Sequence, residues 1–145
     1  MTTCTIAIGA RRQYKVRVDA ADVAFLRQWK WSFRHATWRY GACVHACRGV
    51  RRGGRPVNLY MHTVILTERM GLPRPSPGHT TDHRNIDSLD NTRRNLRWAT
   101  HSEQRINQRR LTKAQMAAHA VAAAGCARAA QRERAHKHDH GRKGR

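Results

Sequence analysis

The chain has 145 residues, of which 29 are Lys or Arg and 9 are Asp or Glu, so its formal net charge is +20. This length fits one domain with appendages, and the charge far exceeds what solubility requires. Such a surplus indicates a polyanionic partner, with nucleic acid ahead of an acidic membrane surface. A membrane partner is disfavoured, because the sequence offers neither a helix that pairs an aromatic face with a basic one nor an apolar run that spans a bilayer.

The cysteines and the N-terminal segment bear on the cellular compartment. The chain contains Cys4, Cys43, Cys47 and Cys126. Their scattered spacing fits no strong zinc motif, and we interpret them as buried or strand-surface thiols of a reducing cytosol, with Cys43, His45 and Cys47 as an alternative ligand set. Residues 1–13 carry only a short apolar patch before two arginines, which does not match a secretory signal. We therefore expect a cytoplasmic protein encoded by a bacterium or a phage.

The N-terminal region has the alternation of β-strands. Apolar and polar residues alternate over residues 3–8 and 14–18, which predicts two strands. Asp19 is suited to cap a short helix over residues 20–28 with one apolar face. Aromatic residues alternate again from 31 to 44 and predict strands that face this helix. We expect the tryptophans to close a small core.

A glycine-containing run of arginines interrupts this pattern. The residues RRGGR at 51–55 predict a chain reversal before the alternation resumes at 57–61. Arg51, Arg52 and Arg55 would then form a basic hairpin tip, and we assign them as candidate DNA contacts. Aromatic residues near them could stack on bases, but a domain this small more often needs its aromatics as core.

The next segment predicts a helix followed by a loop. Residues 61–70 form an amphipathic pattern that Gly71 is placed to end. His62 falls in the first turn, where a lone histidine favours a structural role over metal binding. Three prolines between residues 73 and 77 then predict an extended surface loop.

The stretch over residues 80–110 is the centre of the sequence. A short segment bounded by turn residues at 80–83 and a second short run with Trp98 at 96–99 predict two strands that pair across a long polar loop. The residues Thr-His-Ser-Glu at 100–103 form a capping box and predict a helix that continues to about residue 109. The expected order is strand, loop, strand and helix.

This order collects groups for metal binding and proton transfer. Asp82 and His83 would project from one end of the paired strands, and Gln104 in the first helical turn could reach back toward Asp82. Asn107 lies close to the same helical face and is the other candidate amide. A carboxylate and an amide oxygen suit a hard divalent cation. A neutral imidazole beside such an ion can deprotonate a water molecule near neutral pH.

These residues resemble the HNH endonucleases of the phage and homing-endonuclease type. The resemblance covers residues 14–110 and rests on Met61-His62, Thr81-Asp82-His83-Arg84-Asn85, Leu89-Asp90-Asn91-Thr92-Arg93-Arg94-Asn95-Leu96-Arg97-Trp98-Ala99-Thr100 and Ser102-Glu103. It implies a ββα-metal unit, in agreement with the order of elements above. The chain departs from the family at Gln104, where the family usually has asparagine.

The resemblance also implies roles for individual residues. His83 would be the general base, Asp82 a metal ligand, and Asn95 the residue that holds the loop and helps to orient the histidine. Either Gln104 or Asn107 would complete the metal site, and we favour Gln104. Mg²⁺ is the expected ion, with Mn²⁺ as the alternative. His62 matches a family histidine that precedes the module, and we expect it to give structural support.

The expected function is single-metal hydrolysis of phosphodiester bonds in DNA. His83 would activate the attacking water, and the products would be a 5′-phosphate and a 3′-hydroxyl. Arg93, Arg94 and Arg97 are candidates for contact with the DNA backbone, because guanidinium groups match phosphate oxygens. The alternative function is a catalytically weak nucleic-acid-binding protein on the same scaffold.

The sequence therefore predicts an α+β protein in three parts. Residues 1–60 form a small β-rich N-terminal region, residues 61–110 the ββα-metal HNH module, and residues 111–145 a basic helical and disordered tail. The tail is rich in alanine to about residue 135. Its basic end would add DNA affinity that weakens as salt rises. Histidines 136, 138 and 140 could bind a transition metal adventitiously, but we interpret this end as solvated.

Overall fold

The structure is a computed structural model that describes residues 2–12, 14–38 and 41–109. The predicted helix and tail after residue 110 lie outside the described residues. Met1–Arg34 and His45–Arg110 belong to one compact unit, and residues 35–44 belong to a second. The first unit contains residues of both the predicted N-terminal region and the predicted nuclease module, and it holds all the candidate site residues.

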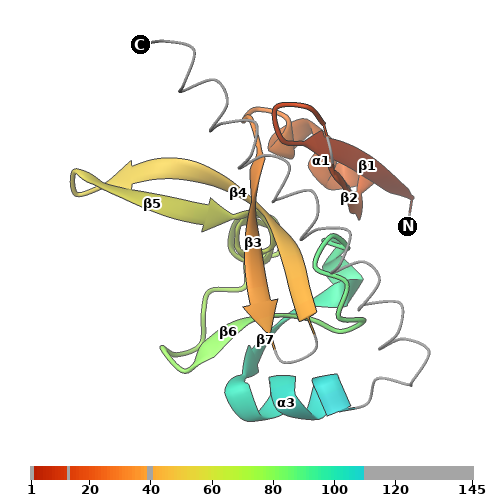
Figure 1. Cartoon of the computed structure of the whole chain (residues 1–145), viewed down its shortest axis with the longest axis vertical. Coiled ribbons are helices and arrows are strands. Elements are labelled where there is room, and N and C mark those ends of the chain that lie inside the picture. Colours follow the sequence, from red (N-terminus) through yellow and green to blue (C-terminus); the bar gives the residue numbers. More distant parts are fainter. Residues whose placement is uncertain (1, 13, 39–40, 110–145) are drawn as a thin grey trace, which may run out of the picture. The chain divides into compact units, whose positions relative to one another are not determined.

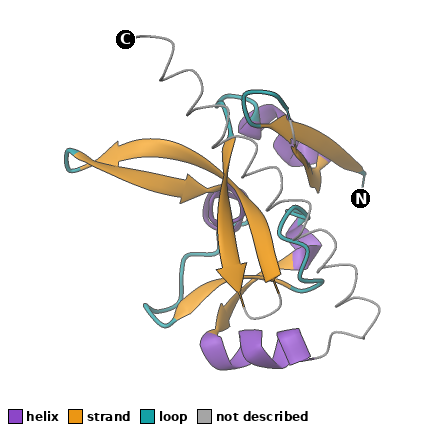
Figure 2. Cartoon of the chain, viewed as in Figure 1, coloured by secondary structure: helices purple, strands orange, loops and turns teal. Residues whose placement is uncertain are grey.

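The first unit is a mixture of small antiparallel sheets and short helices, as the sequence predicted at the level of an α+β fold (Figures 1 and 2). Strands β1 (Thr3–Ile8) and β2 (Tyr14–Asp19) form a hairpin in which Ile6 pairs with Val16. The side chains of Ile6, Ile8, Val16 and Val18 are buried, and the residues between them in each strand are exposed. The predicted alternation is therefore confirmed, because apolar residues at even spacing cover one face of a two-stranded sheet.

Helix α1 (Ala20–Leu26) follows β2 directly and ends two residues earlier than expected. Asp19 occupies the N-cap position with extended backbone, as expected, but its side chain makes no capping hydrogen bond to the helix. Its carboxylate instead accepts a hydrogen bond from the backbone N–H of Arg93, at 2.7 Å. The Asp19 carboxylate, which the local sequence suggested as a helix cap, therefore binds the backbone of a residue distant in the chain.

A three-stranded sheet follows, in the order β3-β4-β5. Its strands are β3 (Ser32–Trp38), β4 (Gly41–Arg52) and β5 (Arg55–Tyr60). Gly53 and Gly54 make the turn between β4 and β5, with φ angles of 54° and 75°. Two successive positive φ angles match the twist of a hairpin and suit glycine, so the predicted reversal is confirmed. Figure 1 shows β4 and β5 as a ribbon that ends in this turn.

The predicted helix over residues 61–70 is present as two consecutive segments. Helix α2 (Met61–Val64) continues directly into a short π-helix, η1 (Ile65–Arg69). Gly71 follows with a φ angle of 65°, the left-handed conformation that commonly ends a helix. No described helix is long and apolar enough to cross a membrane.

The last described elements have the predicted order. Strands β6 (His79–His83) and β7 (Leu96–Thr100) are antiparallel, with the short 3₁₀ helix η2 (Arg93–Asn95) just before β7. Helix α3 (His101–Arg109) follows β7 and contacts both strands. The capping box is confirmed by two hydrogen bonds. The Glu103 carboxylate accepts one from the Thr100 N–H, and the Glu103 N–H donates one to the Thr100 hydroxyl oxygen.

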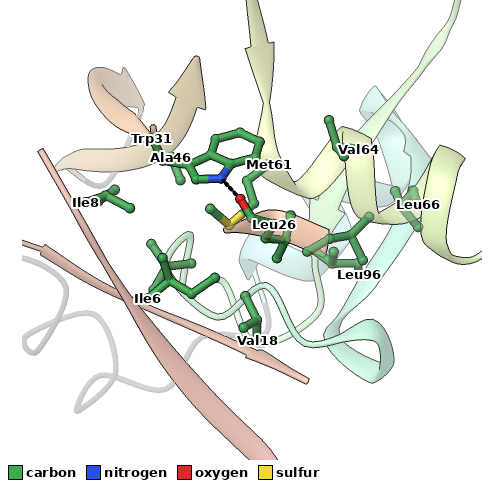
Figure 3. Packing of buried hydrophobic residues seen from close by; sticks show 12 residues of the cluster. Ile6, Ile8, Val18, Leu26, Trp31, Ala46, Met61, Val64, Leu66 and Leu96 are labelled. Atoms are coloured by element: carbon green, nitrogen blue, oxygen red, sulfur yellow. Dashed lines mark hydrogen bonds between the residues drawn. The ribbon is translucent and has the colours of Figure 1, made fainter. Parts of the chain in front are cut away.

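One apolar core joins the elements of this unit (Figure 3). Ile8, Leu26 and Met61 are fully buried in it, and the Trp31 indole donates a hydrogen bond of 2.8 Å to the Leu26 carbonyl. Leu96, at the start of β7, belongs to the same cluster. Strand β7, which pairs with the strand that carries Asp82 and His83, is therefore packed in the same core as residues from the N-terminal hairpin and helix.

Candidate functional site

Asp82 and His83 lie at the end of β6, where the strand leaves the sheet and the polar loop begins. The register places Asp82 opposite Arg97 of β7. The Arg97 guanidinium donates from Nε at 2.8 Å and from Nη2 at 2.7 Å to one carboxylate oxygen, Oδ2. The Asp82 side chain is 12% exposed. Its other oxygen, Oδ1, lies 3.5 Å from Nδ2 of Asn107 in a long hydrogen bond.

The His83 imidazole is held by a side chain that the sequence analysis did not single out. His83 Nε2 and Asn91 Oδ1 are 2.8 Å apart, and both residues are buried. With the amide oxygen as acceptor, Nε2 carries the proton and Nδ1 keeps the lone pair that a general base needs. Asn91 is part of the Leu-Asp-Asn run in the polar loop, so its chemistry was visible in the sequence but its partner was not.

Two further histidines surround His83. The ring centroids of His62 and His83 are 5.3 Å apart, and those of His45 and His83 are 6.2 Å apart. His62 also stacks on Tyr60, with 5° between the ring planes. His62 thus contacts the candidate base from the first turn of α2, which agrees with the supporting role expected for it.

Burial keeps these imidazoles neutral. It lowers the pKa of His83, and the hydrogen bond with Asn91 and the charge of Asp82 oppose it only in part. Burial, followed by the charge of His83, lowers the pKa of His45 to about 4. The same causes hold the pKa of His62 well below its usual range. A neutral His83 is the form that can accept a proton.

The two candidate amides of α3 contact different residues of β6. Asn107 Nδ2 is 3.2 Å from Asp82 Oδ2 and 3.1 Å from the His83 carbonyl oxygen. Gln104 instead donates a hydrogen bond to the Thr80 hydroxyl. The expectation that Gln104 reaches back to Asp82 is therefore corrected. Gln104 and Asn107 are nearly one helical turn apart, and they meet Thr80 and Asp82, which lie on one face of the strand.

The donor set at Asp82 fits a hard divalent ion. Among the described residues, no group of three or more His, Cys, Asp or Glu side chains is placed to hold a metal. Mg²⁺ does not require such a group, because it keeps several waters and binds through one or two carboxylates together with substrate phosphate. Asp82 has carboxylate oxygens of this kind and Asn107 an amide oxygen, and in the structure the Nδ2 of Asn107 is the atom that faces Asp82.

Asn95 closes the polar loop, as the resemblance implied. Its Oδ1 accepts a hydrogen bond of 2.9 Å from the Asn85 N–H, and its Nδ2 donates one of 2.7 Å to the Asp90 carbonyl. The expected task of orienting the histidine is met by Asn91, whose side chain contacts His83 directly. Asn95 holds the loop in which Asn91 lies.

The candidate arginines divide into a group that is ion-paired with aspartates and a group that is exposed. Arg93 binds the buried carboxylate of Asp22 through Nε at 2.8 Å and Nη2 at 2.5 Å, which gives it a structural task that the sequence did not indicate. Arg97 is occupied by Asp82. Arg94 is exposed, and so are the hairpin arginines Arg51, Arg52 and Arg55. Only this second group presents its charge to solvent.

Comparison with known proteins gave no match to a family model, to a curated protein or to a solved structure.

Proposed function

We propose that the chain is an HNH-type endonuclease that hydrolyses phosphodiester bonds of DNA with one divalent metal ion, Mg²⁺ ahead of Mn²⁺. The observation that carries the proposal is the meeting of Asp82, His83 and Asn107 at the end of β6. The Asp82 carboxylate and the Asn107 amide lie 3.2 Å apart, the same amide contacts the backbone carbonyl of His83, and the His83 imidazole is hydrogen-bonded to Asn91. Proton transfer and metal binding need these groups side by side.

The proposed mechanism begins at His83. Nδ1 accepts a proton from a water molecule, while Asn91 holds Nε2–H and stabilises the charged ring that forms. The resulting hydroxide attacks the phosphorus and the bond to the 3′-oxygen breaks. The leaving 3′-oxygen takes a proton from solvent water, and a 5′-phosphate and a 3′-hydroxyl result. Asp82 and Asn107 would hold the ion, which when bound stabilises negative charge on the phosphoryl and leaving oxygens.

DNA would be bound by the charge that remains exposed. Arg94 adjoins the site in sequence, and Arg51, Arg52 and Arg55 surround the turn of the β4-β5 hairpin. Added Cβ atoms on Gly53 and Gly54 would meet nothing within 4 Å among the described residues, so nothing packs closely on the turn. We leave Arg93 out of this proposed surface, because its guanidinium is bound to Asp22.

A second candidate function is nucleic-acid binding without efficient cleavage. It is favoured by the 7% exposure of His83 and by the guanidinium of Arg97 on Asp82, both of which limit access to the site. A nuclease would have to move Arg97 or bind the ion through Oδ1 alone.

Plasmid cleavage separates the two functions. Wild type and His83→Ala are incubated with supercoiled DNA in Mg²⁺ and in Mn²⁺, and DNA binding is measured by gel shift in parallel. The nuclease proposal predicts that the wild type cleaves at least about 100-fold faster while both proteins shift DNA equally. Equal and slow cleavage by both proteins, with binding retained, would establish the binding function.

A further inference from the structure

The edge of β2 is paired with the polar loop of the candidate site. Arg17 donates its backbone N–H to the Leu89 carbonyl at 2.8 Å, and its own carbonyl accepts the Asn91 N–H at 2.8 Å. Together these bonds make a short parallel bridge between Arg17 and Asp90. The N-terminal hairpin therefore holds the backbone on both sides of Asp90.

The side chain of Arg17 also binds the polar loop, through an ion pair with Asp90. Its Nη2 is 2.7 Å from Asp90 Oδ2, and the Asp90 side chain is only 5% exposed. Asp90 also accepts hydrogen bonds from the Asn85 side chain at 2.7 Å and from the Thr92 hydroxyl at 2.9 Å. The buried carboxylate of Asp90 thus binds side chains from both ends of the loop, Asn85 and Thr92. The positive charge of Arg17 compensates the negative charge of this carboxylate.

Burial by itself raises the pKa of Asp90, but the hydrogen bonds from Arg17 and Thr92 outweigh burial and lower it. Asp90 is therefore a carboxylate anion at neutral pH. A charged acceptor forms stronger hydrogen bonds than a neutral one, which stiffens the loop around it.

Asn91, the residue after Asp90, connects this loop to His83 through a hydrogen bond with the imidazole. Asn91 is fully buried, and among the described residues its Nδ2 has no hydrogen-bond partner. The direction of its side chain is therefore set by its backbone and by the one bond to His83. Its backbone, in turn, is fixed by the carbonyl of Arg17 and by the neighbouring Asp90.

We propose that Arg17 is a positioning residue of the nuclease site, which acts through Asp90 and Asn91 to hold the imidazole of His83 in one orientation and one tautomer. This role rests on the proposed function. Arg17 lies on β2, 73 residues before Asp90 in the chain, and makes no hydrogen bond or ion pair with Asp82 or Asn107 in the described structure. A displacement of about 1 Å at a catalytic group can lower a rate by about 100-fold, so a support of this kind has a measurable effect.

The test compares Arg17→Met with Lys15→Met. Lys15 is exposed on the same face of β2, so the control removes the same charge and leaves the loop contact intact. Arg17→Met is expected to lower kcat for plasmid cleavage at least about 10-fold with KM unchanged, and Arg17→Lys to restore most of the loss. Lys15→Met should leave kcat within about twofold.

A second measurement does not depend on cleavage. The ¹⁵N chemical shifts of the His83 ring report which nitrogen carries the proton. They should indicate a single Nε2–H tautomer in the wild type and Lys15→Met, and a mixture in Arg17→Met and in Asp90→Asn. Circular dichroism checks that each variant is folded, and Asp90→Asn replaces Arg17→Met if the latter unfolds.

The outcomes separate this role from the proposed function. Ring shifts that stay unchanged in Arg17→Met and Asp90→Asn would overturn the positioning role, as would a loss confined to KM. If the wild type cleaves no DNA but the ring shifts change as described, the nuclease proposal fails while the control of His83 by Arg17 stands.

Discussion

At the scale of single residues, the two amides of α3 give the clearest prediction. Asn107 lies against Asp82 and Gln104 against Thr80, so Asn107 is the amide that can share an ion with the carboxylate. Asn107→Ala is expected to lower metal-dependent cleavage at least about 100-fold, and Gln104→Ala by less than about fivefold. Cleavage rates over a range of Mn²⁺ concentrations measure both. A larger loss of cleavage in Gln104→Ala than in Asn107→Ala would indicate that Gln104 is the metal ligand.

The sequence predicted these residue-level features unequally. Asp82 and His83 are adjacent, so their joint presence at the end of a strand could be read directly. The sequence could not decide between Gln104 and Asn107 as the partner of Asp82. That choice depends on which residues of α3 lie opposite Thr80 and Asp82 of β6. Asn91 was missed as the partner of His83, since only the closed loop brings the two side chains together.

At the scale of elements, the β4-β5 hairpin is expected to contribute affinity rather than chemistry. Replacing Arg51, Arg52 and Arg55 with alanine should weaken DNA binding and reduce the slope of log affinity against log salt by up to about 3, without changing kcat. Binding isotherms at several salt concentrations measure the slope. The control removes equal charge from exposed residues elsewhere, through alanine at Lys15, Arg27 and Lys30. Equal slopes in both triple variants would show that the hairpin has no special part in binding.

Most elements followed from local pattern, and the exceptions have tertiary causes. Alternation located the N-terminal strands, and the glycine pair located the hairpin turn, because both depend on neighbouring residues alone. The tertiary partners of Asp19 and Arg93 could not be found from local pattern, because they lie more than 70 residues away in the chain. Charged residues that pair across a fold leave no local signature.

At the scale of the whole molecule, Asp22 ties three segments together. Its fully buried carboxylate binds Arg69 of η1 at 2.9 Å and Arg93 of η2 at 2.5 Å, while Asp22 itself belongs to α1. Asp22→Asn would leave two partly buried guanidinium groups without their counter-charge and is expected to lower the free energy of unfolding by about 3 kcal/mol. Urea unfolding measures this. Asp87→Asn, at a half-exposed carboxylate, is the control and should cost less than about 1 kcal/mol.

The buried histidines make the fold sensitive to acid. The pKa values of His45, His62 and His83 are lowered in the folded protein, so the unfolded chain binds more protons below pH 6.5. Their contribution to stability is complete above pH 6.5 and is lost as the pH falls through 6.5 toward 4. For His45 alone, the change from 6.5 to about 4 corresponds to a loss of about 3 kcal/mol at the acidic end.

Urea unfolding at pH 7.5 and at pH 5 measures this loss. His45→Gln should reduce the difference in unfolding free energy between the two pH values, whereas His101→Gln, at an exposed histidine of α3, should leave it nearly unchanged. A wild-type protein that is equally stable at both pH values would contradict the burial of neutral imidazoles.

The most direct test of the account is metal-dependent cleavage by the wild type and by Asp82→Asn. Both proteins are treated with EDTA, dialysed and mixed with supercoiled DNA, and the rate of nicking is followed as Mn²⁺ is added. The wild type should be inactive without metal and recover along a saturating curve, while Asp82→Asn, which keeps the side-chain size but loses the charge, should remain at least about 100-fold slower. Cleavage by the wild type in EDTA, or equal recovery of both proteins, would contradict the proposal that Asp82 holds the ion beside His83.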